Sequence, residues 1–180
     1  LDINVIKVCI SRDINPYRDF LSFVRLFLVF KKHKFDLIHS VTPKAGLLSM
    51  IASFFSRCPI RIHIFTGQVW VTKRGLVKFF LKYADKIISV LATHILADSF
   101  SQREYLIQEN IVHYNKIKVL ANGSISGVDI SKFKPDLFSR NKIRNELNIS
   151  NHNLVYLFIG RLKVDKGIVD LAIAFSKLEK

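Results

Sequence analysis

Short β-branched runs alternate with longer amphipathic stretches along most of this 180-residue chain. This alternation is typical of repeated strand–helix units and of a mostly parallel sheet. Several of the runs are almost continuously apolar, as expected for strands that are covered on both faces. We expect strands at 5–10, 36–39, 60–65, 94–97, 116–120 and 154–159. The predicted fold class is therefore α/β with a largely parallel sheet.

Three expected helices carry start signals. Thr42 and Pro43 fit an N-cap residue followed by proline at the first helical position. Ser99 and Gln102 have the spacing of a capping box, and Asp165 is expected to cap the last helix.

The regular pattern is interrupted between residues 131 and 153 by a proline, a charged helical segment and a polar run. A single strand and a single helix follow, and one such unit cannot bury its own faces. We therefore expect a first domain at 1–133, a linker at 134–153 and the opening of a second domain at 154–180. Because the chain starts with Leu1 rather than Met, we also expect that its amino terminus has been cut from a longer protein.

Composition excludes several classes of protein. The formal net charge is +14, but 49% of the residues are hydrophobic and 15 are Phe, which excludes a disordered basic tail. Two cysteines are too few for a disulfide framework or a zinc site. No run reaches the roughly 18 apolar residues that a membrane span needs.

The common nucleotide and hydrolase motifs are absent: the chain has no G-x-G-x-x-G, no P-loop, no Asp-x-Asp pair and no G-x-S-x-G. A different phosphate-binding pattern is present at 158–167, FIGRLKVDKG. Gly160 and Arg161 leave an expected strand, and Lys166 opens the next helix, so two cations and a helix amino end would meet a diphosphate. The alternative is that both cations are ordinary solvated loop charges. We expect no cofactor and no metal.

A second loop, at 120–133, follows an expected strand and contains Gly123 and Gly127. Glycine allows close approach of the backbone to a ligand, so this loop could cradle a phosphate or a sugar. It could equally be a tight connection between domains.

Five segments together resemble glycosyltransferase family 4, in particular its bacterial surface-polysaccharide members. They are, in order, FDLIHSVTPKAGLLS, HIFTGQVWVTKRG, ILADSFSQREYLIQENI, ANGSISGVDISKF and FIGRLKVDKGIVDLAIAF. The resemblance implies a GT-B fold, present as a Rossmann-like N-terminal domain and the first strand–helix unit of the C-terminal domain. It further implies a retaining transferase that uses a nucleotide-diphosphate sugar and acts on a lipid-linked glycan acceptor.

The resemblance also implies roles for individual residues. The diphosphate contacts fall on Gly160, Arg161 and Lys166. The family's N-terminal-domain histidine is replaced by Thr66, with His63 three positions earlier, so both are candidate catalytic residues. For His63 a structural role in the strand is the alternative.

Further candidate substrate contacts lie where expected strands end. Gly67 and Gln68 follow one strand, and His39, Thr42 and Lys44 occupy the equivalent exit of the preceding one. For His39 the alternative is a hydrogen-bonded residue at the strand end.

The positive charge is concentrated between residues 37 and 84, which include seven Lys and Arg and no Asp or Glu. Lys78, Lys82 and Lys86 are spaced four apart on an expected helix that is otherwise apolar, a pattern that suits contact with an anionic membrane surface. A solvated stripe on a core-packed helix is the alternative. No nucleic-acid recognition motif accompanies the charge, so nucleic acid is not an expected partner.

The resulting hypothesis is a cytoplasmic glycosyltransferase, peripheral on the inner face of the membrane, with a nucleotide sugar and a lipid-linked glycan as partners. The chain lacks two glutamates that the family uses late in its C-terminal domain, so we expect no turnover by this chain alone. A non-catalytic, basic, membrane-peripheral module derived from the same fold is the alternative.

Overall fold

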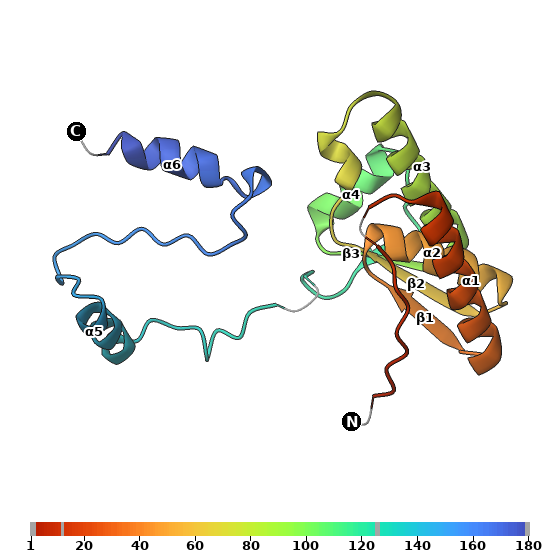
Figure 1. Cartoon of the computed structure of the whole chain (residues 1–180), viewed down its shortest axis with the longest axis horizontal. Helices are drawn as coiled ribbons and strands as arrows, with labels where there is room; N and C mark the ends of the chain where they lie inside the picture. Colours follow the sequence, from red (N-terminus) through yellow and green to blue (C-terminus); the bar gives the residue numbers. More distant parts are fainter. Residues whose placement is uncertain (1–2, 12, 125–126, 179–180) are drawn as a thin grey trace. The chain divides into compact units, whose positions relative to one another are not determined.

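The computed structural model describes residues 3–11, 13–124 and 127–178. The chain divides into two compact units, Leu1–Val128 and Asp129–Lys180 (Figure 1). Each unit is described by itself.

The first unit is built on a four-stranded parallel sheet of β1 (Leu37–Ser40), β2 (Ile60–Phe65), β3 (His94–Ala97) and β4 (Ile117–Val119). The strands pair in the order β1-β2-β3-β4, so each lies beside the strand that precedes it in the chain. The register places Ser40 opposite His63 and His63 opposite Ile95. The expected α/β class with a parallel sheet is confirmed.

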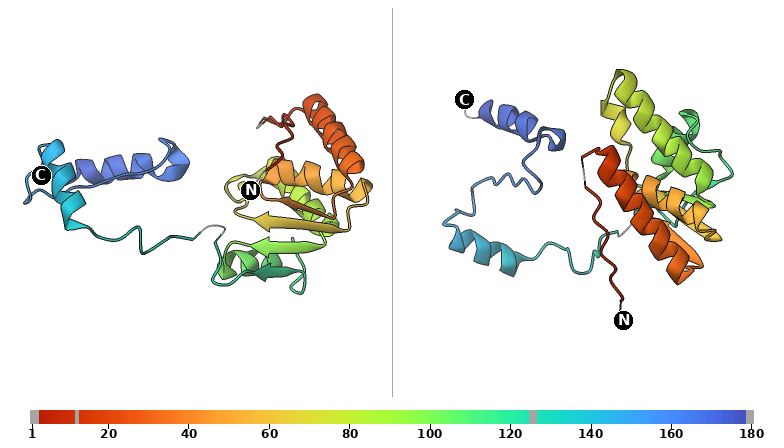
Figure 2. Two further views of the ribbon diagram at one scale, coloured as in Figure 1. Left: turned by 90° about the horizontal axis from the view of Figure 1, so that it is seen from below. Right: turned by 45° about the vertical axis from the view of Figure 1, so that its right-hand side comes forward.

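The helices of this unit are α1 (Pro16–His33), α2 (Pro43–Phe55), the short 3-10 helix η1 (Val69–Thr72), α3 (Gly75–Leu91) and α4 (Phe100–Gln108). Right-handed crossovers between successive neighbouring strands place the connecting helices on one face of a sheet. Accordingly Met50 of α2, Ile88 of α3 and Leu106 of α4 share one buried cluster with Phe65 and Ile95. Helix α1 contacts α2 and lies outside it, farther from the sheet (Figure 2).

Two of the predicted helix starts are confirmed. Thr42 is the N-cap of α2, which begins at Pro43. Ser99 caps α4, its Oγ accepting a hydrogen bond from the backbone N–H of Gln102 at 3.1 Å. The Gln102 side chain accepts in turn from the backbone N–H of Asp98.

The strand predictions for 5–10 and 154–159 are wrong, because both segments are free of any strand pairing. A ladder needs backbone hydrogen bonds to a neighbouring strand, and neither segment forms such a ladder with the four described strands. Val8 and Ile10 instead pack on a small cluster that contains Leu26 and Leu48. Val8 and Ile10 are half-buried, whereas Val5 and Ile6 are exposed, so the apolar composition suggested a strand that does not form.

The second unit contains α5 (Leu137–Glu146), the short 3-10 helix η2 (Val164–Lys166) and α6 (Ile168–Ser176). Asp136 caps α5 by accepting from two backbone N–H groups. The predicted cap of α6 is wrong: the N-cap is Gly167, at a φ of 75°, because η2 occupies the residues before it. In this unit the ring of Tyr156 lies against that of Phe175.

Candidate substrate-binding site

Five of the predicted contact residues lie beyond the carboxyl ends of two neighbouring strands. Thr42 and Lys44 follow β1, and Thr66, Gly67 and Gln68 follow β2. Thr42, Thr66 and Gly67 are exposed, whereas Lys44 and Gln68 are half-buried. Since β1 and β2 are parallel, the structure brings these residues to one edge of the sheet, where open α/β sheets bind ligands.

His63 lies in the interior, with only 1% of its surface exposed. Its Nδ1 is 2.8 Å from Ser40 Oγ, and its ring meets the ring of Phe65 edge to face. Burial, aided by the nearby His39, lowers the pKa of His63 to about 4, so its imidazole is neutral at pH 7. This placement fits the structural alternative for His63.

Helix α2 approaches the His63 ring closely at Gly46. A Cβ atom on this glycine would lie 2.5 Å from His63 Cε1, which is too close for any real contact. Glycine at position 46 therefore allows α2 to pack directly on the imidazole.

His39 is exposed and belongs to the opposite face of the sheet from His63. Ser40 is the register partner of His63, and successive residues of a strand point to opposite faces. The structure does not bring the two histidines into one site.

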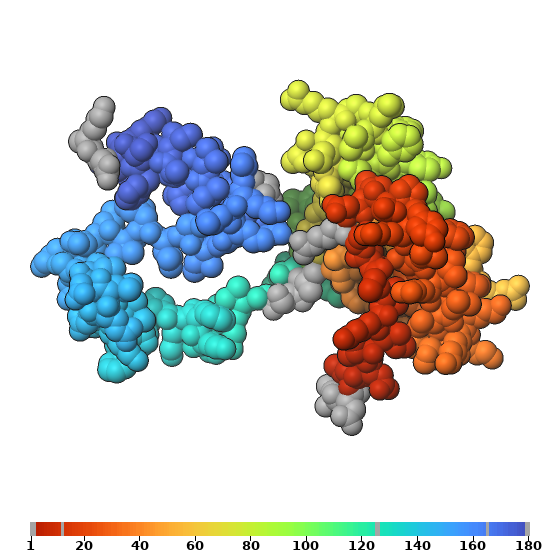
Figure 3. Space-filling view, in the orientation of Figure 1, coloured from red at the N-terminus to blue at the C-terminus, as the bar shows by residue number. Residues whose placement is uncertain are grey.

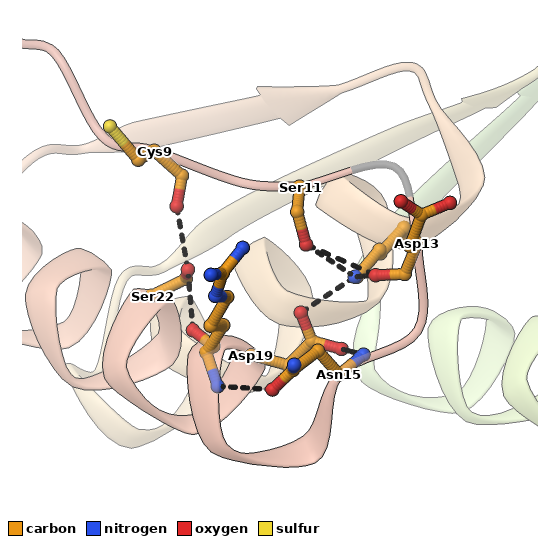
Figure 4. Close-up of polar contacts among 8 residues, drawn as sticks. Cys9, Ser11, Asp13, Asn15, Asp19 and Ser22 are labelled. Carbon is orange, nitrogen blue, oxygen red and sulfur yellow. Dashed lines mark hydrogen bonds and ion pairs between the residues drawn. The ribbon is translucent and has the colours of Figure 1, made fainter.

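Lys44 of α2 contacts Asp19 of α1 and the loop before that helix, where Figure 4 labels Asp13, Asn15 and Asp19. Its Nζ lies 2.6 Å from Asp19 Oδ1 and donates to the backbone carbonyl of Asp13 at 2.5 Å. The backbone N–H of Asn15 donates to the other carboxylate oxygen of Asp19. The Lys44 ammonium, predicted as a substrate contact, thus has a carboxylate partner within the first unit.

Gln68 carries an unusual polar group. Its Nε2 is buried and has no hydrogen-bond partner among the residues that the structure describes. An unpaired buried donor is rare in folded proteins. Because it lies three residues beyond the end of β2, Gln68 is a good candidate for contact with a bound ligand.

A local backbone contact explains why residue 123 is a glycine. Its φ is 89°, and a Cβ atom at this position would lie 2.3 Å from the backbone oxygen of Asp98. The next residue, Ser124, donates its backbone N–H to the same oxygen at 2.6 Å. The loop after β4 is thus tied to the end of β3, which fits a tight connection.

A buried pair that the sequence analysis missed lies beside this edge of the sheet. Trp70 Nε1 donates to Asp85 Oδ2 at 2.7 Å, and the indole stacks on Tyr105. Burial raises the pKa of Asp85 to about 6, although the hydrogen bond from Trp70 lowers it. One feature of the sequence could have pointed to Asp85. It is the first carboxylate after residues 37–84, which contain no Asp or Glu.

The three lysines of α3 contact the protein. Lys82 Nζ lies 2.7 Å from Glu109 Oε2, and Lys86 Nζ donates to the backbone oxygen of Asn110. The ammonium groups of Lys78 and Lys82 lie 5.9 and 5.6 Å from the centroid of the Trp70 ring. Lys86 is exposed, and so are six large apolar or aromatic residues of α3: Leu76, Val77, Phe79, Phe80, Tyr83 and Val90.

The predicted diphosphate contacts all belong to the second unit. Gly160 and Arg161 are exposed in the irregular segment before η2, and Lys166 is the last residue of η2, just before α6. Within the described ranges no group of three or more His, Cys, Asp or Glu side chains could hold a metal ion. In the same part of the chain no helix is both long and apolar enough to cross a membrane.

The family model and the relatives that match this chain agree with one another. A family model described as Glycosyltransferase Family 4 matches residues 2–124. The capsular polysaccharide biosynthesis glycosyltransferase CapM of Staphylococcus aureus is 37% identical over 167 residues, which are 92% of this chain and 43% of CapM. The UDP-Gal:alpha-D-GlcNAc-diphosphoundecaprenol alpha-1,3-galactosyltransferase of Escherichia coli is 29% identical over 88% of this chain and 40% of its own length.

Among solved structures, Anabaena Alr3699/HepE in complex with UDP-glucose superposes with a TM-score of 0.63 at 24% identity. The match covers 87% of this chain and 40% of that protein. The chain thus spans about two fifths of the length of the relatives that it matches.

Proposed function

The chain belongs to glycosyltransferase family 4, and from this we propose that its protein transfers a sugar from a nucleotide-diphosphate sugar to a glycan acceptor in surface-polysaccharide biosynthesis. The observation that carries the proposal is the family match over residues 2–124, which include the whole sheet. The similarity to CapM, a capsular polysaccharide biosynthesis glycosyltransferase, supports the proposed role in surface-polysaccharide biosynthesis. The transfer is proposed to retain the anomeric configuration, and the transferred sugar to be a hexose.

A UDP sugar is the proposed donor. The E. coli relative is named for UDP-Gal, and the HepE structure contains UDP-glucose. In this chain Arg161 and Lys166 would neutralise the charge that grows on the departing diphosphate, and Gly160 would allow close approach of the backbone. One such contact is typically worth about 3 kcal/mol in the transition state. Two cations suit a diphosphate held without a metal.

The acceptor is proposed to be a lipid-linked glycan that binds at the carboxyl edge of the sheet in the first unit. Thr42, Thr66, Gly67 and Gln68 are the candidate contacts. Gln68 Nε2, which is buried without a hydrogen-bond partner in the described part of the chain, supports this assignment. His63 would act as a positioning residue, because its hydrogen bond to Ser40 joins the ends of β1 and β2.

A location on the inner face of the membrane is part of the proposal. It is supported by the exposed apolar and aromatic side chains of α3. Figure 3 shows this helix, in yellow-green, at the surface of the first unit. Lys73 and Arg74 lie exposed just before this helix and supply positive charge beside the apolar face.

An NMR titration of the 15N-labelled chain with UDP tests the donor assignment, since chemical shifts detect weak binding. We expect the amides around Gly160 and Gly167 to shift, and Arg161→Ala to remove the effect. Arg140→Ala is the matched control, because Arg140 is an exposed arginine of α5 outside the proposed site. Equal shifts in the Arg161→Ala variant and the unmodified chain would remove Arg161 from the site.

A further inference from the structure

A cavity of about 480 Å³ lies in the first unit where the amino end of α2 meets η1 and α3. Its walls are mostly apolar and include Leu47 of α2, Trp70 of η1, and Val77, Phe80 and Leu81 of α3. The volume falls within the range of about 300–1,000 Å³ that is usual for small-molecule sites. The cavity is therefore large enough to hold a ligand.

Four of the polar residues in the cavity wall, Asp19, Lys44, Trp70 and Asp85, are already paired with one another. Lys44 is paired with Asp19, and Asp85 accepts from Trp70. A sugar bound inside would lose hydrogen bonds to water and find few replacements, which is costly. Lys73, also in the lining, is exposed. The chemistry favours an apolar ligand with an anionic group at the cavity mouth.

The position of the cavity connects two surfaces. Its lining includes Lys44 and Val69, which lie close in the chain to the proposed acceptor contacts Thr42 and Gln68. Val77 and Phe80 line the cavity and are also exposed on α3. An elongated ligand could thus run from the carboxyl edge of the sheet to the apolar surface of α3.

We infer that this cavity binds the isoprenoid chain of the lipid-linked acceptor, at the part next to its diphosphate, and that Lys73 pairs with the diphosphate. The inference rests on the proposed function and names a subsite for it. The E. coli relative is named for a diphosphoundecaprenol, which joins an apolar isoprenoid chain to a diphosphate. This combination matches the apolar walls and the neighbouring cation.

Trp70 provides a direct test, since it is the only tryptophan of the chain and lines the cavity. The probe is geranylgeranyl diphosphate, a short isoprenoid diphosphate, added to the chain while tryptophan fluorescence is measured. We expect a saturable change with this probe and none with inorganic diphosphate. No change with the probe, or an equal change with inorganic diphosphate, would overturn the inference.

Two variants with a matched control sharpen the test. Val77→Gln places an amide in the cavity wall, whereas Val90→Gln makes the same change on α3 outside the cavity; the two valines are 54% and 65% exposed. We expect Val77→Gln to weaken probe binding about tenfold and Val90→Gln to leave it unchanged. Ala84→Leu, which adds methyl groups inside the cavity, should weaken it to a similar extent. Circular dichroism verifies that each variant is folded, and wild-type affinity in both cavity variants would overturn the inference.

The UDP titration on the same samples separates this inference from the proposed function. If UDP binds and the probe does not, the cavity assignment alone is overturned. If the probe binds with the expected variant effects and UDP does not, the cavity assignment is supported and the donor assignment is lost.

Discussion

Gly46 and His63 show how one missing methyl group positions a helix. A Cβ atom at residue 46 would overlap the buried imidazole. We expect the overlap in Gly46→Ala to lower the free energy of unfolding by about 1–3 kcal/mol. The better helix propensity of alanine offsets about 1 kcal/mol of this loss. Denaturant unfolding measures the change.

A double-mutant cycle provides the control for this prediction. In a His63→Ala background the imidazole is gone, so Gly46→Ala should become neutral or stabilising. If Gly46→Ala has the same effect in both backgrounds, the proposed contact does not limit the packing of α2.

His63 and Asp85 make opposing contributions to the pH dependence of stability. The pKa of His63 falls from 6.5 to about 4 on folding, so its contribution is present above pH 6.5 and is lost as the pH falls to 4. The pKa of Asp85 rises from 3.8 to about 6, so the penalty for burying its charge disappears over the range from pH 6 to 4. Each of these pKa differences changes the free energy of unfolding by about 3 kcal/mol. The two changes have opposite signs and largely cancel.

The variant Asp85→Asn removes one side of this balance while keeping an acceptor for Trp70. Between pH 6.5 and 4 we expect its free energy of unfolding to fall by about 3 kcal/mol more than that of the wild type. Urea unfolding at several pH values measures this difference. Asp170→Asn, a change at an exposed carboxylate of α6, should follow the wild-type profile. Parallel profiles for Asp85→Asn and the wild type would contradict the assignment.

At the level of elements, the segment at 5–10 is held in place without a strand partner. Ser22 Oγ of α1 lies 2.7 Å from the carbonyl oxygen of Cys9 and 2.8 Å from that of Arg18. We expect Ser22→Ala to speed trypsin cleavage after Lys7 in the segment, while the free energy of global unfolding falls by about 1 kcal/mol or less.

Ser53→Ala is the matched control for Ser22→Ala. Ser53 is a buried helical serine whose hydroxyl donates within α2, to the carbonyl of Met50. Its loss should leave trypsin cleavage after Lys7 unchanged. A wild-type cleavage rate in the Ser22→Ala variant would show that apolar packing alone holds the segment.

The strands and their surroundings were predictable to different degrees. The strands at 60–65 and 94–97 were predicted to the residue, because β-branched runs with clear ends report local preference well. The segments at 5–10 and 154–159 have the same local pattern, but strand pairing depends on a neighbour that a local pattern does not reveal. Alternation correctly placed His63 and Phe65 on one face. That α2 covers this face, and that Trp70 meets Asp85, are tertiary contacts between distant residues.

For the whole molecule, the concentration of positive charge leads to a prediction on membrane binding. We expect the chain to bind vesicles that contain anionic phosphatidylglycerol at low salt, and to bind less as salt screens the charges. Phe79→Ser should weaken binding, because Phe79 belongs to the exposed apolar surface of α3. Vesicle co-sedimentation measures both effects.

Phe138→Ser is the control for Phe79→Ser, since Phe138 is an exposed phenylalanine of α5 in the second unit. An equal loss in both variants would point to general hydrophobicity rather than to α3. Failure to bind at low salt would exclude the membrane proposal.

The strand order of the first unit has a consequence for how the chain reaches its fold. Each of β2, β3 and β4 pairs with the strand that was synthesised just before it, and only helices and their short loops lie between the paired strands in the chain. The sheet can therefore grow by one strand at a time as the chain leaves the ribosome, without waiting for a distant segment. Contacts close in sequence also favour rapid folding. An interruption of synthesis after β3 would leave a shorter sheet with the same pairing, rather than a chain with its central strands unpaired.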